Sequence, residues 1–476
     1  MSVFAPDRLR RTAPAPNSGI VHLGLGAFFR AHGAIYLQQS MAQCGGDWGV
    51  VGVSLRSPDV RDRLAGQDNL YTALEMSALG PKPRIVDSIT GVLFAPEDPD
   101  AVLTAMAAET TRIVSLTVTE KGYYRGSGAG VIDWDHADIR HDLEADHPKT
   151  AVGYLVRALG IRRHRGLRPF TILSLDNLPA NGVLTRALVC GFAERIDADL
   201  ARWIAAECKF PGTMVDRIVP ATPESVNQRF HDTSTYTDRA LVTHEPFCQW
   251  VIEDDFVDGV RPALDVAGAQ FVADVGPYED MKLRMLNGSH SALAYLGHLA
   301  GYETVAQAIG DKSLMRFVTA LWRDEMAPSL TAPAGTDLQA YAMQLLERYQ
   351  NPEIRHLLAQ IAVDGSQKLP QRIVAPLFEN RAAGRPYTKL LTVLAAWFRF
   401  IERRATIDQA PLDDPLAHDL MNAARNASDD SELVRNLLET GFMFGGYPTS
   451  EIAAELIALL GQNGTFDDPA RLGGPP

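Results

Sequence analysis

The stretch that decides the fold is residues 20–32, IVHLGLGAFFRAH. Its first four residues are apolar or β-compatible, Gly24 and Gly26 follow directly, and helix-compatible residues then continue to Met41. This order predicts a strand, a tight turn and a helix. The other strands predicted in the first half of the chain would extend the sheet that this unit begins.

Further apolar runs predict the rest of a sheet. Residues 48–55 follow the first strand within the ~30 residues typical of a strand–helix–strand unit, and similar runs occupy residues 112–118 and 170–175. Helical patterns such as residues 101–108 and 151–159 lie between them. Strands that alternate with helices predict a mostly parallel, Rossmann-type sheet covered on both faces.

The apolar spacing changes after about Asp274 and becomes mostly helical. We therefore predict an α/β domain over residues 1–274 that binds a dinucleotide, and a mostly α-helical substrate and catalytic domain over residues 275–476. A chain of 476 residues also exceeds what one core usually organises. The longest helical patterns cover residues 313–325, 338–349, 387–401 and 450–460.

Charge and cysteine content exclude several classes of protein. The formal net charge is -13, and no run of Lys and Arg offers the basic surface that nucleic acid or anionic lipid requires. The four cysteines lie far apart without a CxxC pair, which argues against a structural zinc site and a disulfide framework. The N-terminal residues lack the apolar core of a secretory signal, so we expect a soluble cytoplasmic protein. The oligomeric state stays open, a monomer included.

The paired glycines suggest a dinucleotide site. A missing Cβ at Gly24 and Gly26 lets the backbone approach a pyrophosphate, and the following helix supplies N–H donors. An ordinary strand–turn–helix is the alternative, because Phe29 replaces the usual third glycine. The acidic residue expected after the second strand is also missing, and Arg56 follows Leu55 instead. Arg56 suits either an adenine or a 2′-phosphate, so we expect NAD without excluding NADP.

The segment from Lys282 to His290 carries the most informative spacing. At about 100° per residue, Lys282, His290 and Asn287 fall at roughly 0°, 80° and 140° on a helical wheel, so one face can present all three. Oxidation of a secondary alcohol needs a base for the hydroxyl proton and donors for the developing alkoxide. A buried lysine can be that base, and no metal is then needed. The alternative is a solvated helix with a break at Asn287 and a packed histidine.

Polar residues also follow two of the predicted strands, at the edge where α/β sheets bind ligands. Asn177 follows the run at residues 170–175, and Thr119, Glu120 and Lys121 follow the run at residues 112–118. Simple surface turns would explain the same residues.

Five segments in order resemble the polyol-specific long-chain dehydrogenase family, also called the mannitol dehydrogenase family. Its members include mannitol 2-dehydrogenases, arabinitol dehydrogenases and fructuronate reductases. The likeness runs from about residue 18 to about residue 375. The five segments are Gly24-Leu-Gly-Ala-Phe-Phe-Arg-Ala-His32, Thr117-Val-Thr-Glu-Lys-Gly-Tyr123, Asp176-Asn-Leu-Pro-Ala-Asn-Gly182, Thr213-Met-Val-Asp-Arg217 and Lys282-Leu-Arg-Met-Leu-Asn-Gly-Ser-His290.

The resemblance implies a metal-independent enzyme whose active site lies between the two domains. It implies that Lys282 is the general base and that Asn177 and Asn287 form the oxyanion hole. It also implies that His290 and Asp216 contact or position the substrate, and that Glu279 relays the proton outward. We expect the cofactor to be contacted by Gly24, Gly26, Phe28, Arg30, Arg56, Thr119, Glu120 and Lys121.

The segment Asp364-Gly-Ser-Gln-Lys-Leu-Pro-Gln-Arg372 is most similar to the fructuronate reductases of the family. Where mannitol-oxidising members resemble one another in having an arginine, this chain has Gln360, and Arg372 supplies a new cation four residues after Lys368. A Lys368 and Arg372 pair would suit a sugar carboxylate. A solvated basic turn around Pro370 is the alternative.

We therefore predict a small-molecule sugar acid as the substrate and interconversion of D-fructuronate and D-mannonate as the reaction. The second hypothesis is a mannitol 2-dehydrogenase or arabinitol dehydrogenase that acts on a neutral polyol. The third, from another class, is a catalytically silent nucleotide-binding protein, because a fold does not fix a function.

Overall fold

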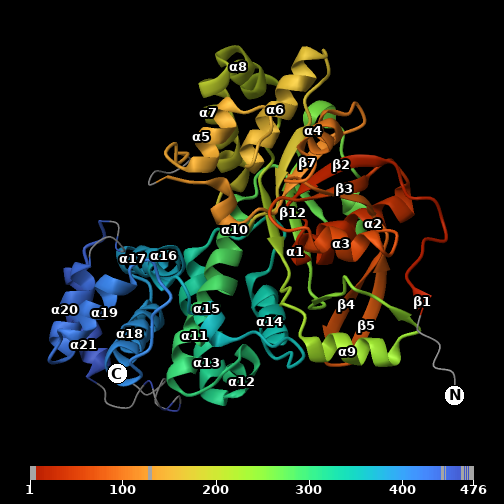
Figure 1. Ribbon diagram of the computed structural model, residues 1–476. Coiled ribbons are helices and arrows are strands. Elements are labelled where there is room, and N and C mark those ends of the chain that lie inside the picture. Colours follow the sequence, from red (N-terminus) through yellow and green to blue (C-terminus); the bar gives the residue numbers. More distant parts are fainter. Residues whose placement is uncertain are drawn as a thin grey trace. The chain divides into compact units, whose positions relative to one another are not determined.

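The chain divides into two compact units, Met1–Gly276 and Pro277–Pro476. This computed structural model (Figure 1) describes residues 7–126, 131–440 and 446–461, together with Phe444, Phe466, Asp468 and Ala470. The predicted class, a Rossmann-type α/β domain followed by a mostly helical domain, is confirmed. Among the described residues, no helix is long and apolar enough to cross a membrane.

The centre of the first unit is a parallel sheet of five strands in the order β6-β3-β2-β7-β8. The segment at residues 20–32 supplies its middle strand, which pairs with β3 on one side and β7 on the other. The strands are β2 (Ser18–Leu23), β3 (Gly49–Ser54), β6 (Ile89–Phe94), β7 (Ile113–Leu116) and β8 (Thr171–Ser174).

Both faces of this sheet are covered, because side chains alternate along each strand. Val21 and Leu23 pack into a core shared with α4 (Pro99–Ala107), α6 (Ala151–His164) and α7 (Asn181–Ile196). Ile20 points to the other core, with residues of α1 (Ala27–Ala31) and α2 (Gly33–Cys44). The remaining helices of the unit are α3 (Asp59–Ala65), η1 (Glu120–Tyr123), α5 (Ala137–Glu144), α8 (Ala198–Glu207), α9 (Glu224–Thr233), η2 (Val257–Gly259) and η3 (Leu264–Ala267).

Three smaller sheets were not anticipated from the sequence. One has the order β11-β4-β5, and its edge strand β5 carries two prolines and an exposed lysine, a composition that gives no apolar alternation. The others are β13-β12-β9 and β1-β10. The strands are β1 (Asp7–Arg8), β4 (Tyr71–Ser77), β5 (Gly80–Val86), β9 (Thr213–Asp216), β10 (Tyr236–Thr237), β11 (Val242–His244), β12 (Gln249–Glu253) and β13 (Gln270–Val272).

All the regular secondary-structure elements among the described residues of the second unit are helices, and four of them are π-helical. The buried α18 (Thr388–Glu402) lies at its centre and packs against α11 (Ser289–Leu299). The π-helices are η4 (Lys282–Gly288), η5 (Trp322–Met326), η7 (Pro370–Val374) and η8 (Arg403–Ile407). The other helices are α10 (Gly276–Met281), α12 (Val305–Gly310), α13 (Lys312–Leu321), η6 (Ala327–Ser329), α14 (Leu338–Tyr349), α15 (Leu358–Ile361), α16 (Gly365–Leu369), α17 (Ala375–Ala382), α19 (Ala417–Arg425), α20 (Asp430–Glu439) and α21 (Ser450–Leu460).

Candidate active site

A pocket of about 810 Å³ lies at the carboxyl ends of the parallel strands in the first unit. This is the edge at which doubly wound sheets bind their ligands, and the volume is in the usual range for a small-molecule site. Loops after β2, β3 and β7 line it, and so does the start of α6. Of the residues expected to contact a cofactor, Gly24, Gly26, Arg56 and Thr119 line this pocket.

The two glycines of the turn have different roles. Gly24 has a φ of 89°, and a Cβ there would stand 2.3 Å from the carbonyl oxygen of Thr117, so this position needs glycine for the fold itself. A Cβ on Gly26 would meet only the carbonyl of Gly24, at 3.7 Å. Nothing within the described chain requires glycine at position 26. Its missing side chain leaves open space beside α1, whose N-terminus no side chain caps.

A buried hydrogen-bond chain fixes the turn. The Thr117 hydroxyl donates to the Gly24 carbonyl at 2.7 Å and therefore accepts from His22 Nε2 at 2.8 Å. His22 Nδ1 then accepts from the hydroxyl of Ser115 at 2.8 Å. Burial lowers the pKa of His22 to about 3, so the imidazole stays neutral and this arrangement of donors holds.

The loop after β7 is held by a buried carboxylate from the end of β8. Asp176 accepts hydrogen bonds from the amides of Val118 and Thr119 at 3.1 and 2.8 Å, and from the Tyr123 hydroxyl at 2.8 Å. Burial raises the pKa of Asp176. Asn177, the next residue, is exposed in the turn at the same edge of the sheet.

Four expected cofactor residues do not line the pocket. Arg30 is buried and donates to the carbonyl of Ala240 at 2.5 Å, so its described contacts are structural. Phe28 stacks on His32 at 5.1 Å between ring centroids. Glu120 pairs with Arg125 at 3.1 Å, and Lys121 is exposed on η1.

In the second unit, the segment predicted to carry the chemistry is a π-helix and not an α-helix. The helix does not break at Asn287, because α10, η4 and α11 follow one another without a gap. Residues five apart are hydrogen-bonding neighbours in a π-helix. Lys282 and Asn287 are five apart, so they lie closer in angle than the α-helical wheel predicted.

The widened turn leaves backbone carbonyls that side chains must satisfy. The carbonyl of Met285 accepts from Trp322 Nε1 at 2.9 Å and from the Ser289 hydroxyl at 2.5 Å. The carbonyl of Leu286 accepts from the Tyr349 hydroxyl at 2.9 Å. These bonds fix η4 to η5 and α14, and with it the positions of Lys282 and Asn287.

His290 is buried and neutral. Burial and the nearby His356, Arg348, Arg372 and Lys282 all lower its pKa well below the ordinary value. Its Nε2 atom has no hydrogen-bond partner among the described residues. A neutral imidazole with an open nitrogen can accept a hydrogen bond from a hydroxyl or donate one to it.

Arg372 also lies beside Asn287 and His290. Its guanidinium donates over long distances to the Asn287 carbonyl at 3.4 Å and to the Ser291 hydroxyl at 3.3 Å. Burial lowers its pKa to about 10. It lies in η7, so the expected alternative of a solvated turn around Pro370 does not describe this segment.

Lys368 lies on α16, one helical turn before Arg372. Its Nζ donates to the carbonyl of Val363 at 2.6 Å, and burial followed by the charge of Arg372 lowers its pKa. Gln360 is exposed on α15.

The sequence did not single out two of the groups that surround His290. Its ring is 4.7 Å from that of Tyr349 and 5.0 Å from that of His356, measured between centroids. Tyr349 ends a correctly predicted amphipathic helix, where an aromatic residue is typical of a core. His356 lies in a polar loop without a motif, so no signal pointed to it.

The other expected site residues are placed as follows. Glu279 lies on α10, one turn before Lys282. Asp216 is buried at the end of β9 in the first unit, and Asn177 is exposed in the turn that follows β8. Convergence of Asn177 and Asp216 with the cluster of the second unit stays a prediction.

Comparison with known proteins identifies the family. Residues 18–266 match the mannitol dehydrogenase Rossmann domain, and residues 274–460 match the mannitol dehydrogenase C-terminal domain. The chain belongs to the mannitol dehydrogenase family. Members of this family are NAD-dependent oxidoreductases that act on secondary alcohols, so the predicted enzyme class is confirmed.

Relatives with known names act on sugar acids or sugar alcohols. The chain is 47% identical over 391 residues to the D-mannonate oxidoreductase of Escherichia coli (strain K12), covering 81% of this chain and 80% of that protein. It is 42% identical over 442 residues to the mannitol 2-dehydrogenase of Aspergillus terreus, covering 89% and 87%. The chain is thus a polyol or sugar-acid dehydrogenase.

Solved structures agree with this family. The mannitol 2-dehydrogenase of Pseudomonas fluorescens, in a ternary complex with NAD and D-mannitol, is 36% identical with a TM-score of 0.82. The match covers 98% of this chain and 96% of that one. A substrate-free D-sorbitol dehydrogenase is 31% identical with a TM-score of 0.89, covering 98% of both chains.

A substitution at Gly288 tests how closely η4 packs against η7. A Cβ there would stand 2.7 Å from Met326 Cε and 3.1 Å from the Arg372 carbonyl oxygen. We expect Gly288→Ala to lower the free energy of unfolding by about 1–2 kcal/mol, because η7 must shift while the flexible Met326 methyl moves aside. Denaturant unfolding measures this. Gly310→Ala, where a Cβ meets nothing within 4 Å, is the control and should not destabilise the protein; equal losses in both variants would contradict the close approach.

Proposed function

We propose that this enzyme interconverts D-fructuronate and D-mannonate with NAD. The observation that carries the proposal is the environment of Arg372. This guanidinium is partly buried, and its hydrogen-bond partners are one backbone carbonyl and one hydroxyl, with no carboxylate among the described residues. The 47% identity to a D-mannonate oxidoreductase supports the same choice.

The positive charge of Arg372 is not balanced by a carboxylate among the described residues. A buried cation is usually paired, because removing it from water is costly. Arg372 is fixed beside Asn287 and His290, where a sugar acid would place its carboxylate within reach. An arginine fork binds a carboxylate through two parallel hydrogen bonds, and Lys368 one turn away adds a second positive charge.

The residues present fit a nicotinamide dinucleotide. Open space at Gly26 and the uncapped start of α1 suit a pyrophosphate, and Arg56 and Thr119 line the same pocket. When bound, the nicotinamide accepts the hydride of the alcohol or returns it to the ketone. Asp59 does not line the pocket, so it does not supply the acidic contact to the ribose hydroxyls that usually accompanies NAD.

The residues of the chain supply the proton chemistry. We propose that, during mannonate oxidation, the amine of Lys282 takes the hydroxyl proton while the Asn287 amide donates a hydrogen bond to the oxygen. Neutral His290 orients the substrate through its open Nε2. We assign the second amide donor to Asn177, substrate positioning to Asp216 and outward relay of the proton to Glu279.

Variants of Gly24 and Gly26 distinguish an effect on stability from an effect on cofactor binding. Gly24→Ala should lower the free energy of unfolding by about 3 kcal/mol, because it adds both a strained φ and a clash with Thr117. Gly26→Ala should leave unfolding almost unchanged and weaken NAD binding at least tenfold, as measured by fluorescence titration. Unaltered NAD affinity in Gly26→Ala would show that the dinucleotide does not approach this turn.

Lys282 tests the catalytic assignment. Lys282→Ala should lower kcat by at least about a thousandfold, because general-base catalysis contributes about 10²–10⁴ in rate. NAD affinity should stay within about twofold, since Lys282 lies in the other unit. Lys312→Ala, which removes an exposed lysine from the same unit, is the matched control. Turnover that survives in Lys282→Ala would favour a different base or a silent binding protein.

Arg372 tests the choice of substrate. Arg372→Ala should lower kcat/KM for fructuronate about a hundredfold or more, roughly 2.7 kcal/mol, and should not lower kcat/KM for fructose, because a neutral sugar leaves the guanidinium unpaired. Steady-state assays with both ketoses measure this. Arg355→Ala, at an arginine that is 70% exposed in the same unit, is the control. Faster turnover of fructose than fructuronate by the unchanged enzyme would support a mannitol dehydrogenase instead.

A further inference from the structure

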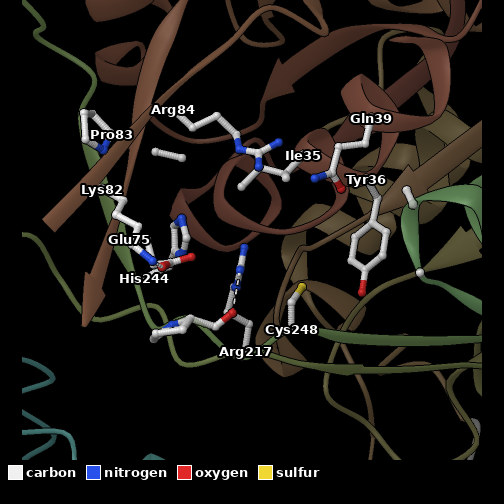
Figure 2. Close-up of a pocket in the computed structure, with 14 residues that line it drawn as sticks. Ile35, Tyr36, Gln39, Glu75, Lys82, Pro83, Arg84, Arg217, His244 and Cys248 are labelled. Carbon is white, nitrogen blue, oxygen red and sulfur yellow. Dashed lines mark hydrogen bonds and ion pairs between the residues drawn. The ribbon is translucent and has the colours of Figure 1, made fainter. Parts of the chain in front are cut away.

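A second pocket of the first unit has features of a binding site that the reaction does not use. It has a volume of about 400 Å³ and is lined by β4, β5, α2 and the segments after β9 and β11 (Figure 2). None of its lining residues lines the dinucleotide pocket. Its volume is within the range of small-molecule sites.

The register of one small sheet builds the floor of this pocket. Ala73 pairs with Arg84, and Glu75 pairs with Lys82 and with His244, so these side chains share one face of β11-β4-β5. Alanine opposite Arg84 leaves room above the sheet. Lys82 is neutralised by Glu75 at 3.5 Å, and this leaves Arg84 as the sheet's uncompensated cation.

The side chain of Arg84 has no hydrogen bond or ion pair to any described residue, and Figure 2 shows its guanidinium within the ring of lining residues. It stands on the exposed edge strand β5, so it is accessible to a ligand from solvent. An arginine that faces a pocket without a partner offers its whole fork to an anion.

Arg217 approaches from another element, and it is fixed in place. Its Nε donates to the carbonyl of Phe247 at 3.0 Å, and its two terminal nitrogens donate to the carbonyls of Ala31 at 2.6 Å and Pro246 at 3.3 Å. These carbonyls orient the guanidinium but do not cancel its charge. The pocket therefore holds two positive charges beyond the Lys82 and Glu75 pair.

His244 adds an acceptor between them. Its Nδ1 donates to the carbonyl of Glu245 at 2.7 Å, which leaves Nε2 as an acceptor. Burial, and then the charges of Arg217 and Arg84, lower the pKa of His244 to about 4, so it is neutral near physiological pH. A ligand that satisfies all three groups is a compact anion that still carries a proton.

We propose that this pocket binds inorganic phosphate in its monohydrogen form. Arg84 and Arg217 bind the charged oxygens, and the phosphate O–H donates to His244 Nε2. Gln39 and Tyr36 of α2 line the same space and offer further polar contacts. The proposal is independent of the sugar that the dehydrogenase uses.

Inorganic phosphate is the probe, in calorimetric titrations of the full chain at low ionic strength and near neutral pH. We expect saturable binding that Arg84→Gln weakens at least tenfold. Arg165→Gln, an exposed arginine after α6, is the matched control and should retain the affinity. Arg56→Gln separates this pocket from the dinucleotide pocket, where phosphate can also bind, and should leave the Arg84-dependent binding intact.

Sulfate is the second probe, because it has a similar shape and charge but no proton at this pH. Weaker binding of sulfate than of phosphate supports the contact to His244 Nε2. Equal binding of the two anions would overturn the assignment to a proton-bearing phosphate. Phosphate binding that is unchanged in Arg84→Gln, or that is lost in Arg56→Gln, would overturn the site itself, and an unaltered unfolding temperature of Arg84→Gln checks that the variant is folded.

Discussion

The candidate chemistry depends on the hydrogen bonds that hold a π-helix open. In an α-helix, the carbonyls of Met285 and Leu286 would be used within the helix. Here the side chains of Trp322, Ser289 and Tyr349 donate to them, and the Leu286 carbonyl also accepts from the backbone amide of Ser289. A widened turn of this kind survives only if its carbonyls are satisfied from outside. The buried neighbours in η5 and α14 thus decide where Lys282 and Asn287 stand, although neither element carries a group that we assign to catalysis.

A similar dependence holds in the first unit. The loop that carries Thr119 is fixed by the Asp176 carboxylate, and the glycine turn is fixed by the chain from Ser115 through His22 to Thr117. Both networks are buried and satisfied, so they hold backbone amides and open space in place before any ligand arrives. Thr117 and Asp176 belong to segments that resemble the family, whereas His22 and Ser115, which complete the chain of hydrogen bonds, do not.

Much of the fold could be predicted from the sequence, because the parallel strands and long helices have strong apolar periodicity. Residues 338–349 and 450–460 form helices with the predicted bounds. Strands such as β5 were missed, since an exposed edge strand with prolines has no alternation to detect. The roles of Lys282, Asn287, His290 and Arg372 stay predictions, and these residues were singled out through spacing and resemblance. The π-helical turn was not, because its cause lies in tertiary hydrogen bonds to Trp322 and Tyr349.

The partial pairing of Arg372 has a consequence for selectivity. A ligand without a carboxylate that excluded water from this guanidinium would leave a buried charge with only two long hydrogen bonds. The loss would be larger than the absence of one attractive contact, because the cost of removing the cation from water would go uncompensated. If a sugar acid is the substrate, the guanidinium would discriminate by making neutral sugars unfavourable, and most strongly where the site excludes water best.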